Sequence, residues 1–245
     1  MNTNQVRHLL ACGCVGALAL VAVGARAAHP LITEDTGTQG AGRYQLEVFA
    51  EEGKERVTRR DREVYTGVLS YGIAETADVQ VGLPLYRSGP DGVGDASLDL
   101  KWRFFQRDAL SLALMPGITL PTGDERDGHG SGKTTWGTLV ILSYAPGAIA
   151  VHAHAGYRRN ENKLGERETL RQLAAAATYR IGNVRFVGEL TRETNPVPGG
   201  RTVRYSTLGA IWSMTRDVDL DIGWRQGSGG APIDEALLLG VTVRW

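Results

Sequence analysis

Residues 94–123 carry the most regular pattern of hydrophobic and polar positions in the chain. In the first half of this stretch hydrophobic side chains fall on Ala96, Leu98, Leu100, Trp102 and Phe104, and polar side chains fall between them. A period of two residues is typical of a β-strand with one apolar and one polar face. After a short break at 106–109, the alternation resumes through 110–120. Two such strands of about ten residues, joined by a tight turn, have the length and pattern of a transmembrane β-hairpin.

The same pattern repeats through the rest of the chain and predicts twelve strands. They are expected at about 43–52, 63–73, 78–87, 96–104, 110–120, 134–144, 148–159, 168–180, 183–193, 201–213, 217–226 and 235–245. The connections alternate between short turns and longer loops, and bacterial outer-membrane barrels place short turns in the periplasm and longer loops outside. The sequence therefore predicts an all-β fold, a transmembrane antiparallel β-barrel of twelve strands with both termini on the periplasmic side.

Large aromatic residues fall near the ends of these predicted strands. At the periplasmic ends they are Tyr44, Tyr71, Trp102, Tyr144, Tyr179, Trp212 and Trp245; at the outer ends they are Tyr65, Tyr86, Trp136, Tyr157, Tyr205 and Trp224. Two aromatic girdles at the membrane interfaces are typical of such barrels, whereas a soluble sandwich buries some of its aromatics mid-strand. The barrel is the favoured interpretation.

The N-terminus reads as an export signal over residues 1–27. Arg7 and His8 precede the apolar stretch 9–23, and Ala25-Arg26-Ala27 offers small residues for cleavage. Residues 28–42 have a turn-like composition and are predicted to form an irregular periplasmic lead-in before the barrel domain at 43–245. Both cysteines, Cys12 and Cys14, lie in the signal, so the mature chain has no disulfide framework. Lysine and arginine together number 27, as do aspartate and glutamate, which gives no indication of nucleic-acid binding.

If the apolar faces meet lipid, the alternate positions line the lumen. The predicted lumen-lining residues are Glu47, Asp95, Asp99, Lys101, Arg103, His152, His154, Arg158, Arg185, Glu189, Asp219, Asp221, Arg225 and Arg244. Charges of both signs must pair in a narrow lumen, because an unpaired buried charge is costly. Two interpretations remain open: an ion-pair network that fills the barrel, and a polar pathway that contacts a small solute. A twelve-stranded barrel lies between filled eight-stranded barrels and open sixteen-stranded porins, so its size does not decide between them.

Three motifs suggest other chemistry, and none of them is complete. His152 and His154 share a strand face, but spacing identifies no third metal ligand, so no metal or cofactor is expected. Ser143 lies near His152 across a turn, yet it faces inward and has no acidic or amide partner to orient the histidine, so no enzyme is expected. Residues 128–135 imitate a phosphate-binding loop, but Asp127 replaces the first glycine and a strand follows instead of a helix. We interpret this stretch as part of the longest outer loop, with Lys133 near lipopolysaccharide phosphate or simply solvated.

Several short motifs in the mature chain resemble one known family. They are His29-Pro30-Leu31-Ile32-Thr33-Glu34-Asp35, Gly82-Leu83-Pro84-Leu85-Tyr86, Gly94-Asp95-Ala96-Ser97-Leu98-Asp99-Leu100-Lys101, residues 116–124, Gly188-Glu189-Leu190 and residues 219–223. The chain resembles the transporter-like outer-membrane β-barrels associated with the meta-cleavage pathway of phenol degradation. The resemblance implies an outer-membrane barrel and the passage of small hydrophobic or aromatic compounds, and it carries no catalytic motif.

Together these observations predict an outer-membrane channel or transporter of a Gram-negative bacterium for passive uptake of small hydrophobic or aromatic compounds. The alternative is a plugged structural or surface-interaction barrel without transport activity. The expected partners are outer-membrane lipid, lipopolysaccharide, a small-molecule solute, and the barrel-assembly machinery through the C-terminal strand ending at Trp245.

Overall fold

The computed structural model describes residues 29–87 and 90–245, and the predicted signal segment lies outside these ranges. The described chain forms thirteen strands. They are β1 Tyr44–Glu55, β2 Asp61–Ala74, β3 Ala77–Tyr86, β4 Gly92–Val93, β5 Ala96–Arg107, β6 Leu110–Leu120, β7 Thr135–Tyr144, β8 Ile149–Arg159, β9 Thr169–Ile181, β10 Val184–Glu193, β11 Val203–Ser213, β12 Val218–Gly229 and β13 Ile233–Arg244. Among the described residues, no helix has the length and apolar character needed to cross a bilayer.

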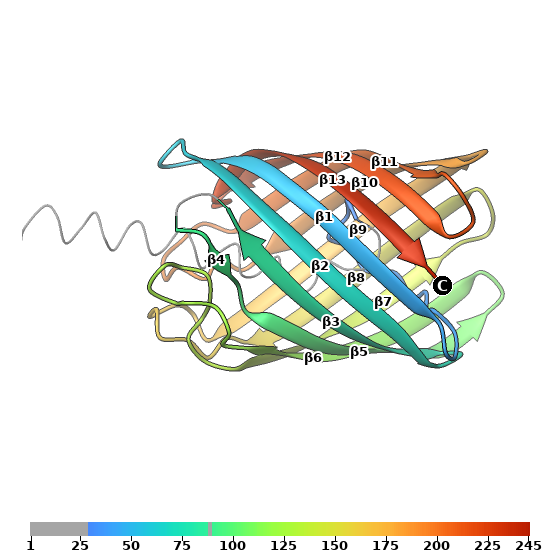
Figure 1. Cartoon of the computed structure of the whole chain (residues 1–245), viewed down its shortest axis with the longest axis horizontal. Coiled ribbons are helices and arrows are strands. Elements are labelled where there is room, and N and C mark those ends of the chain that lie inside the picture. The colour runs from blue at the N-terminus through green and yellow to red at the C-terminus, as the bar shows by residue number, and fades with distance from the viewer. Residues whose placement is uncertain (1–28, 88–89) are drawn as a thin grey trace, which may run out of the picture.

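The strands pair antiparallel in sequence order around a closed barrel, and β4 is a two-residue addition to the edge of β3 (Figure 1). Closure comes from the pairing of β1 with β13, which runs from Gln45 opposite Arg244 to Glu55 opposite Ile233. The predicted twelve-stranded transmembrane barrel is confirmed. Several strands extend one to three residues beyond their predicted ends, as β1 does to Glu55. The reason is that backbone hydrogen bonds between strands continue beyond the membrane into water, whereas the alternation of hydrophobic and polar side chains ends at the membrane surface.

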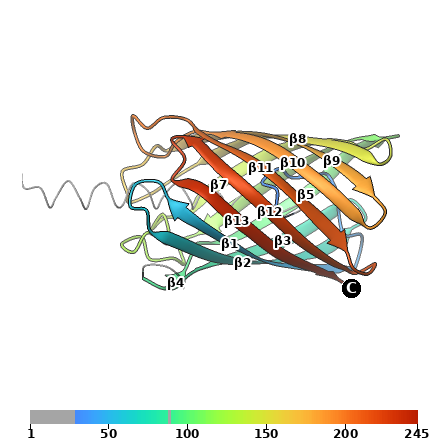
Figure 2. The ribbon, with the colours of Figure 1, turned by 90° about the horizontal axis from the view of Figure 1, so that it is seen from above.

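The two ends of the barrel differ in the length of their connections (Figures 1 and 2). We call the end with the connections 75–76, 108–109, 145–148, 182–183 and 214–217 the short-turn end. The C-terminus lies there, where the Tyr44 N–H donates to the Trp245 carbonyl at 2.9 Å. The opposite end, which we call the long-loop end, carries the connections 56–60, 121–134, 160–168 and 194–202, the link from β3 to β5 that contains β4, and the short turn 230–232.

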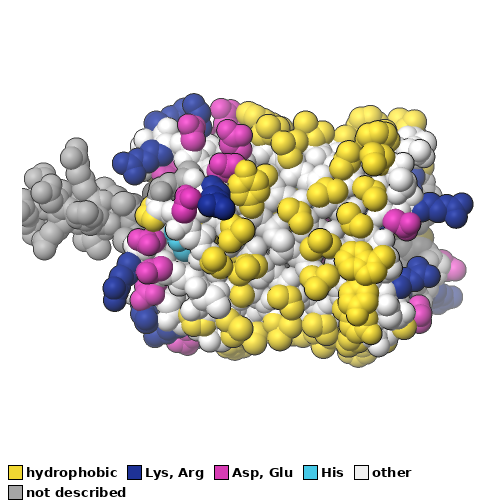
Figure 3. Space-filling view, viewed as in Figure 1, with side chains coloured by type: hydrophobic (Ala, Val, Ile, Leu, Met, Phe, Trp, Pro, Cys, Tyr) yellow, Lys and Arg dark blue, Asp and Glu magenta, His cyan; other side chains and the backbone are white. Residues whose placement is uncertain are grey.

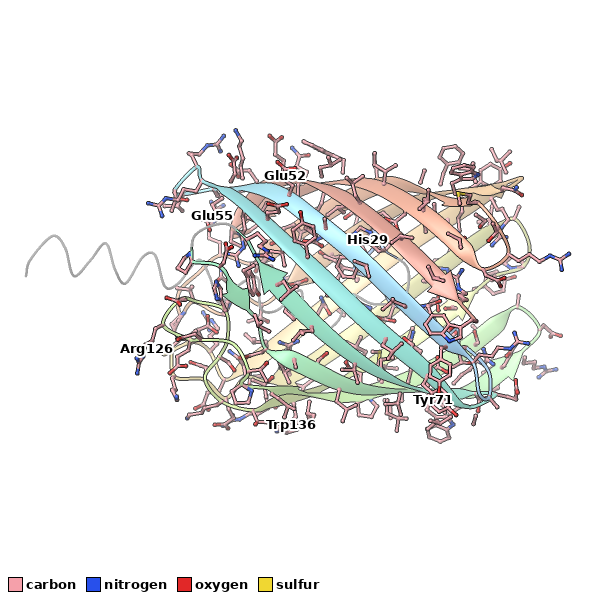
Figure 4. All side chains as sticks on the ribbon, viewed as in Figure 1. His29, Glu52, Glu55, Tyr71, Arg126 and Trp136 are labelled. Carbon is pink, nitrogen blue, oxygen red and sulfur yellow. The ribbon has the colours of Figure 1, made fainter. Side chains whose placement is uncertain are left out.

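A belt of hydrophobic side chains covers the visible face of the barrel between two ends that carry charged side chains (Figure 3). Some outward-facing leucines have a large exposed fraction, 69% for Leu190 and 72% for Leu208. So much exposed apolar surface suits lipid and would be unfavourable in water. Most of the predicted girdle aromatics face outward, and Tyr71 and Trp136 mark opposite ends of the belt (Figure 4). Tyr86 and Tyr205 correct the prediction: they are buried inside, because both occupy inward positions of their strands.

The segment predicted as a periplasmic lead-in runs through the barrel instead. Residues 29–36 are mostly buried, and their partners are inward side chains of strands around the wall. His29 lies behind the strands of the front wall in Figure 4. The segment is irregular, as its composition predicts, but irregular backbone can only be buried where the surrounding wall supplies hydrogen-bond partners. We call residues 29–39 the lumen segment.

Candidate solute pathway in the barrel lumen

Glycines in the wall make room for the start of the lumen segment. Gly209 and Gly223 face each other on β11 and β12, and a Cβ atom added at either would lie 2.6–2.8 Å from atoms of Pro30. On β13, a Cβ added at Gly240 would lie 2.7 Å from His29 Nδ1. These distances are closer than real Cβ contacts. The wall is therefore shaped to the lumen segment at these positions.

Two apolar side chains of the lumen segment pack on apolar inward positions. Leu31 clusters with Ala176, Val187 and Ile211. Ile32 clusters with Val203, Tyr205 and Ala231, towards the long-loop end. Burying a leucine or isoleucine side chain contributes about 1.5–3 kcal/mol. These contacts hold the lumen segment against β9–β11 independently of its polar groups.

Charged wall residues bind the middle of the lumen segment. Lys101 Nζ lies 2.8 Å from Glu34 Oε2, and both side chains are almost fully buried. Glu189 accepts hydrogen bonds from the Thr33 backbone N–H and from the Thr33 hydroxyl, and the Thr207 hydroxyl donates to the same carboxylate at 3.1 Å. The lumen segment thus supplies partners for lumen charges that would otherwise face one another across the barrel.

Hydrogen bonds assign the tautomer of His154. The Glu34 backbone N–H donates to His154 Nδ1 at 3.1 Å, so this nitrogen carries no proton. The other ring nitrogen, Nε2, then donates to Gln172 Oε1 at 3.0 Å, and the Gln172 amide donates to Glu193 at 2.8 Å. A chain of hydrogen bonds therefore leads from the lumen segment towards the long-loop end, with His154 in its neutral form.

The Ser143–His152 pair also contacts the lumen segment. Ser143 Oγ lies 2.8 Å from His152 Nδ1 and accepts the Thr36 backbone N–H at 3.1 Å. The Thr36 hydroxyl lies 2.6 Å from the Ser111 hydroxyl. The Ser143–His152 pair therefore helps to hold the end of the lumen segment against β7 and β8.

The guanidinium of Arg225 joins the lumen segment to the β1 side of the wall. It donates to the Pro30 carbonyl at 3.2 Å and to Glu51 at 2.9 Å, and it lies 5.9 Å from the centre of the Tyr205 ring. Nearby, His29 pairs with Asp221 and stacks on Phe49. Arg225 and Asp221 thus have partners in the barrel wall or the lumen segment.

The structure places the sequence-predicted lining residues on inward positions of their strands, except for Asp95, which lies just before β5 and is buried. Buried are Glu47, Asp95, Asp99, Lys101, His154, Glu189, Asp219, Asp221 and Arg225; partly exposed are Arg103, His152, Arg158, Arg185 and Arg244. Arg103 lies at the short-turn rim, where it donates to the Glu75 carbonyl at 3.2 Å. Contact of any of these residues with a solute stays a prediction.

Sequence reasoning missed the inner partners Glu34, Glu51, Asp78 and Glu193. Asp78 accepts the Gln39 backbone N–H at 3.0 Å where the lumen segment leaves the barrel. A signal for this arrangement was present in the sequence, because inward positions such as Val187 and Ile211 are apolar where a water-filled lumen would favour polar side chains.

A cavity lies in the long-loop half of the barrel, inside β5–β9. It has a volume of about 40 Å³ and is bordered by Met115, Leu139, Leu170, three inward glycines (117, 137 and 156) and the polar residues Asp99, Arg158 and Gln172. Neighbouring groups occupy the space beside these glycines: the Asp99 carboxylate lies against Gly117, and a Cβ added at Gly156 would lie 2.8 Å from Leu139 Cδ2. The lining has the composition of a site for small organic molecules, apolar with a few polar groups, and such a solute would have to displace some of these side chains.

A second cavity lies in the short-turn half, with a volume of about 190 Å³. Its border is polar and includes Asp35 and Gln39 of the lumen segment together with Glu47, Arg185 and Arg244. Lys101 borders this cavity, whereas Asp99, two residues along β5, borders the first. The buried Glu34–Lys101 pair therefore lies at the level where the apolar half of the lumen meets the polar half.

The loop 121–134 folds inward over the long-loop end. Asp95 accepts hydrogen bonds from the Ser131 N–H at 2.8 Å, the Ser131 hydroxyl at 3.0 Å and the Gly123 N–H at 3.0 Å. His129 stacks on Tyr86 with ring centres 4.7 Å apart. The stretch that imitates a phosphate loop is thus largely buried against the barrel, a correction to the predicted solvated loop; within it only Lys133 and Thr134 are exposed.

Two loop carboxyl groups have shifted acidities. The Lys163 ammonium, 3.0 Å from Glu125, holds the pKa of that carboxyl below its usual range. Burial raises the pKa of Glu166, although Asn160 donates a hydrogen bond to it at 3.1 Å.

Within the ranges that the structure describes, no three histidine, cysteine, aspartate or glutamate side chains gather as a metal site would require.

These features define the class: a closed transmembrane β-barrel of the porin type, with a polar interior and a lipid-facing apolar belt. A family model described as "Putative MetA-pathway of phenol degradation" matches residues 30–245, and the chain belongs to that family. A comparison with curated protein sequences found no match.

Solved structures share the fold at low sequence identity. The COG4313 outer membrane channel from Pseudomonas putida F1 is 15% identical, with 86% of this chain and 98% of that one covered and a TM-score of 0.65. The NanC porin is 12% identical over 82% of this chain and 98% of its own, with a TM-score of 0.61. The CymD monoaromatic hydrocarbon channel is 8% identical over 84% and 88%, with a TM-score of 0.50. At such identities the likeness shows the fold alone.

Proposed function

We propose that this barrel is a channel of a Gram-negative outer membrane for the passive uptake of small hydrophobic or aromatic compounds. The long-loop end faces outward and the short-turn end faces the periplasm. Transport is by diffusion, without chemical change of the solute and without an energy source in the chain. The C-terminal strand β13, followed by Trp245, is the segment that the barrel-assembly machinery would recognise.

The observation that carries this proposal is the apolar cavity inside an otherwise charged lumen. Met115, Leu139 and Leu170 offer a surface that favours an aromatic ring over a hydrated ion. The polar side chains at its border would orient a hydroxyl or carboxyl substituent. The family description and the printed name of CymD, a monoaromatic hydrocarbon channel, support the same class of solute.

The experiment compares uptake of a labelled monoaromatic hydrocarbon by intact cells that carry the wild type, Met115→Gln or Ser228→Gln. Met115→Gln keeps the volume of a cavity side chain and makes it polar, whereas Ser228 is an exposed outward residue on β12. We expect Met115→Gln to slow uptake several-fold, because the lining loses apolar contact with the ring. Equal uptake by all three, at equal barrel content, would contradict the proposal.

A plugged barrel without transport is the second candidate, and the lumen segment is the observation that favours it. Buried hydrogen bonds join this segment to β5, β7, β8 and β10. Single-channel recording of the refolded protein, with and without residues 29–39, separates the two. A silent wild type that also takes up no aromatic compound would establish the plugged barrel.

A further inference from the structure

We propose that the outer wall over β7–β11 binds one molecule of lipopolysaccharide, with its phosphates on Arg171, Arg192 and Arg204 and an acyl chain in the groove below. The inference rests on the proposed placement of the long-loop end in the outer leaflet. It concerns the lipid-facing surface and is independent of the lumen and of any solute.

Strands β9, β10 and β11 are neighbours in the wall (Figure 2), and each of the three arginines lies within three residues of the long-loop end of its strand. Arg192 on β10 is directly opposite Arg204 on β11, and on its other side it is opposite Leu173, two residues from Arg171 on β9. All three are exposed outward positions. In the described ranges, none of the three guanidinium groups takes part in a salt bridge.

Such a pairing is unfavourable without an anion. Like charges directly opposite each other on neighbouring strands destabilise a sheet. Several other arginines of the same rim have acidic partners: Arg56 and Arg59 pair with Asp234, and Arg159 pairs with Glu161 and Glu168. The arginines of β9–β11 differ from these in having no acid of the described chain as a partner, which leaves them available to an external anion.

A surface pocket lies beside Arg171 and Arg192. It has a volume of about 350 Å³ and is bordered by Arg167, Arg171, Leu173, Arg192, Glu193 and Thr202. The Glu193 carboxylate accepts a hydrogen bond from the inward Gln172. Guanidinium groups bind phosphate through paired N–H donors, and the Thr202 hydroxyl adds a further donor. The pocket therefore has the chemistry of a phosphate site.

An apolar groove begins where the arginine pocket ends. It has a volume of about 500 Å³ and is bordered by Val140, Leu142, Leu173 and Leu190 and by the small residues Ala153, Ala155 and Ala175. Arg192 and Leu173 border both the groove and the pocket. The alanines leave a depression between larger side chains, so an acyl chain attached to a bound phosphate headgroup could pack in it.

The spacing of the arginines favours lipopolysaccharide over a phospholipid. Neighbouring strands lie about 4.8 Å apart, so the side chains span about 10 Å across three strands. Lipid A carries two separated phosphates and several acyl chains, and it lies in the outer leaflet, next to the long-loop end. A phospholipid offers one phosphate and would use only part of the cluster.

The test measures binding to the purified full barrel by native mass spectrometry with bisphosphorylated lipid A, monophosphoryl lipid A, phosphatidylglycerol and inorganic phosphate as probes. The variant R171Q/R192Q/R204Q removes the cluster. The control R59Q/R87Q/R126Q removes the same charge from exposed positions elsewhere on the rim, where Arg59 and Arg87 pair with acids. A second variant, Ala175→Trp, fills the groove, and Ala50→Trp on β1 is its control.

We expect the cluster variant to bind bisphosphorylated lipid A at least about tenfold more weakly, with little change in the control. Ala175→Trp should weaken lipid A binding, and Ala50→Trp should not. The proposal would be overturned if the cluster variant and its control lost lipid A affinity equally. It would also be overturned if phosphatidylglycerol bound as tightly as lipid A, or if inorganic phosphate alone displaced lipid A. Uptake of the aromatic probe is measured on the same variants and should be unchanged. If the arginine cluster does not bind lipid A, the channel proposal is unaffected. If the barrel does not take up the aromatic probe, the proposed lipid A site is unaffected.

Discussion

The ammonium of Lys101 on β5 lies 2.8 Å from the carboxylate of Glu34 in the lumen segment, and neither side chain is exposed by more than 3%. This contact joins residues 67 positions apart and fixes the middle of the lumen segment to the wall. Because water does not screen the pair, each charge depends on the other for its stabilisation.

Replacing one member of this pair should cost more stability than replacing both. We expect Lys101→Met to lower the free energy of unfolding by about 3–5 kcal/mol, because Glu34 loses its cation, and K101M/E34Q to recover much of that loss. Urea unfolding of the barrel in lipid vesicles, analysed as a double-mutant cycle, measures the coupling. Additive effects of the two single changes would show that the contact contributes little.

Gly223 makes room for Pro30, so a side chain there should displace the lumen segment. In Gly223→Val, the new atoms would meet Pro30 at 2.6 Å and Leu238 at 3.3 Å. We expect a higher single-channel conductance than that of the wild type. The matched control is Gly67→Val on β2, where an added Cβ meets nothing within 4 Å. Unchanged conductance of a correctly folded Gly223→Val barrel would mean that the start of the lumen segment does not restrict the lumen.

A disulfide should fix the lumen segment where it passes β6. The Thr36 and Ser111 hydroxyl oxygens lie 2.6 Å apart, and the sequence from residue 28 onward has no cysteine. We expect T36C/S111C to form the bond and, when oxidised, to conduct less than when reduced. Each single cysteine variant controls for the substitution itself. If oxidised and reduced forms conduct alike, this part of the segment does not move during permeation.

The buried carboxyl group of Glu166 should make the loop 160–168 sensitive to pH. Burial raises its pKa above the ordinary value of 4.5, so the folded loop favours the protonated form. The cost of ionisation is absent below the ordinary pKa and grows as pH rises through the raised pKa, so loop stability should fall with rising pH. Hydrogen exchange of the Leu164 and Glu166 amides, which donate to Asn162 at 3.0 Å, measures this.

Glu166→Gln should remove this pH dependence while it keeps an acceptor for Asn160. Glu125→Gln is the comparison, because the pKa of Glu125 is lowered by Lys163 and its removal should weaken the neighbouring loop instead. The expectation fails if the wild type and Glu166→Gln show the same pH profile of exchange.

The inward and outward parity of each strand could be predicted from sequence, and the lining residues followed from it. The inward orientation of Asp99 and Lys101 could be predicted from their alternation with Leu98, Leu100 and Trp102. The same rule, applied strictly, also places Tyr86 inside, next to the outward Leu85; grouping it with the girdle aromatics was wrong because position along the strand does not define the face.

Other features depended on contacts between distant parts of the chain. The burial of Ser131 depends on Asp95, 36 residues earlier, and a loop composition does not show whether a loop extends into water or folds over the barrel. The partners of the lumen segment are as far as 195 residues away, as in the contact of Pro30 with Arg225. No local pattern of hydrophobicity encodes such a partner.

The sequence by itself determined the barrel, its strand number and the face on which each strand residue lies. A period of two is a local property, because each residue needs only its neighbours to show which side meets lipid. Only the tertiary structure decided what occupies the lumen. An irregular segment such as 29–39 has no period, and its position is set by the glycines, charges and apolar side chains that a closed wall brings together from β3 to β13.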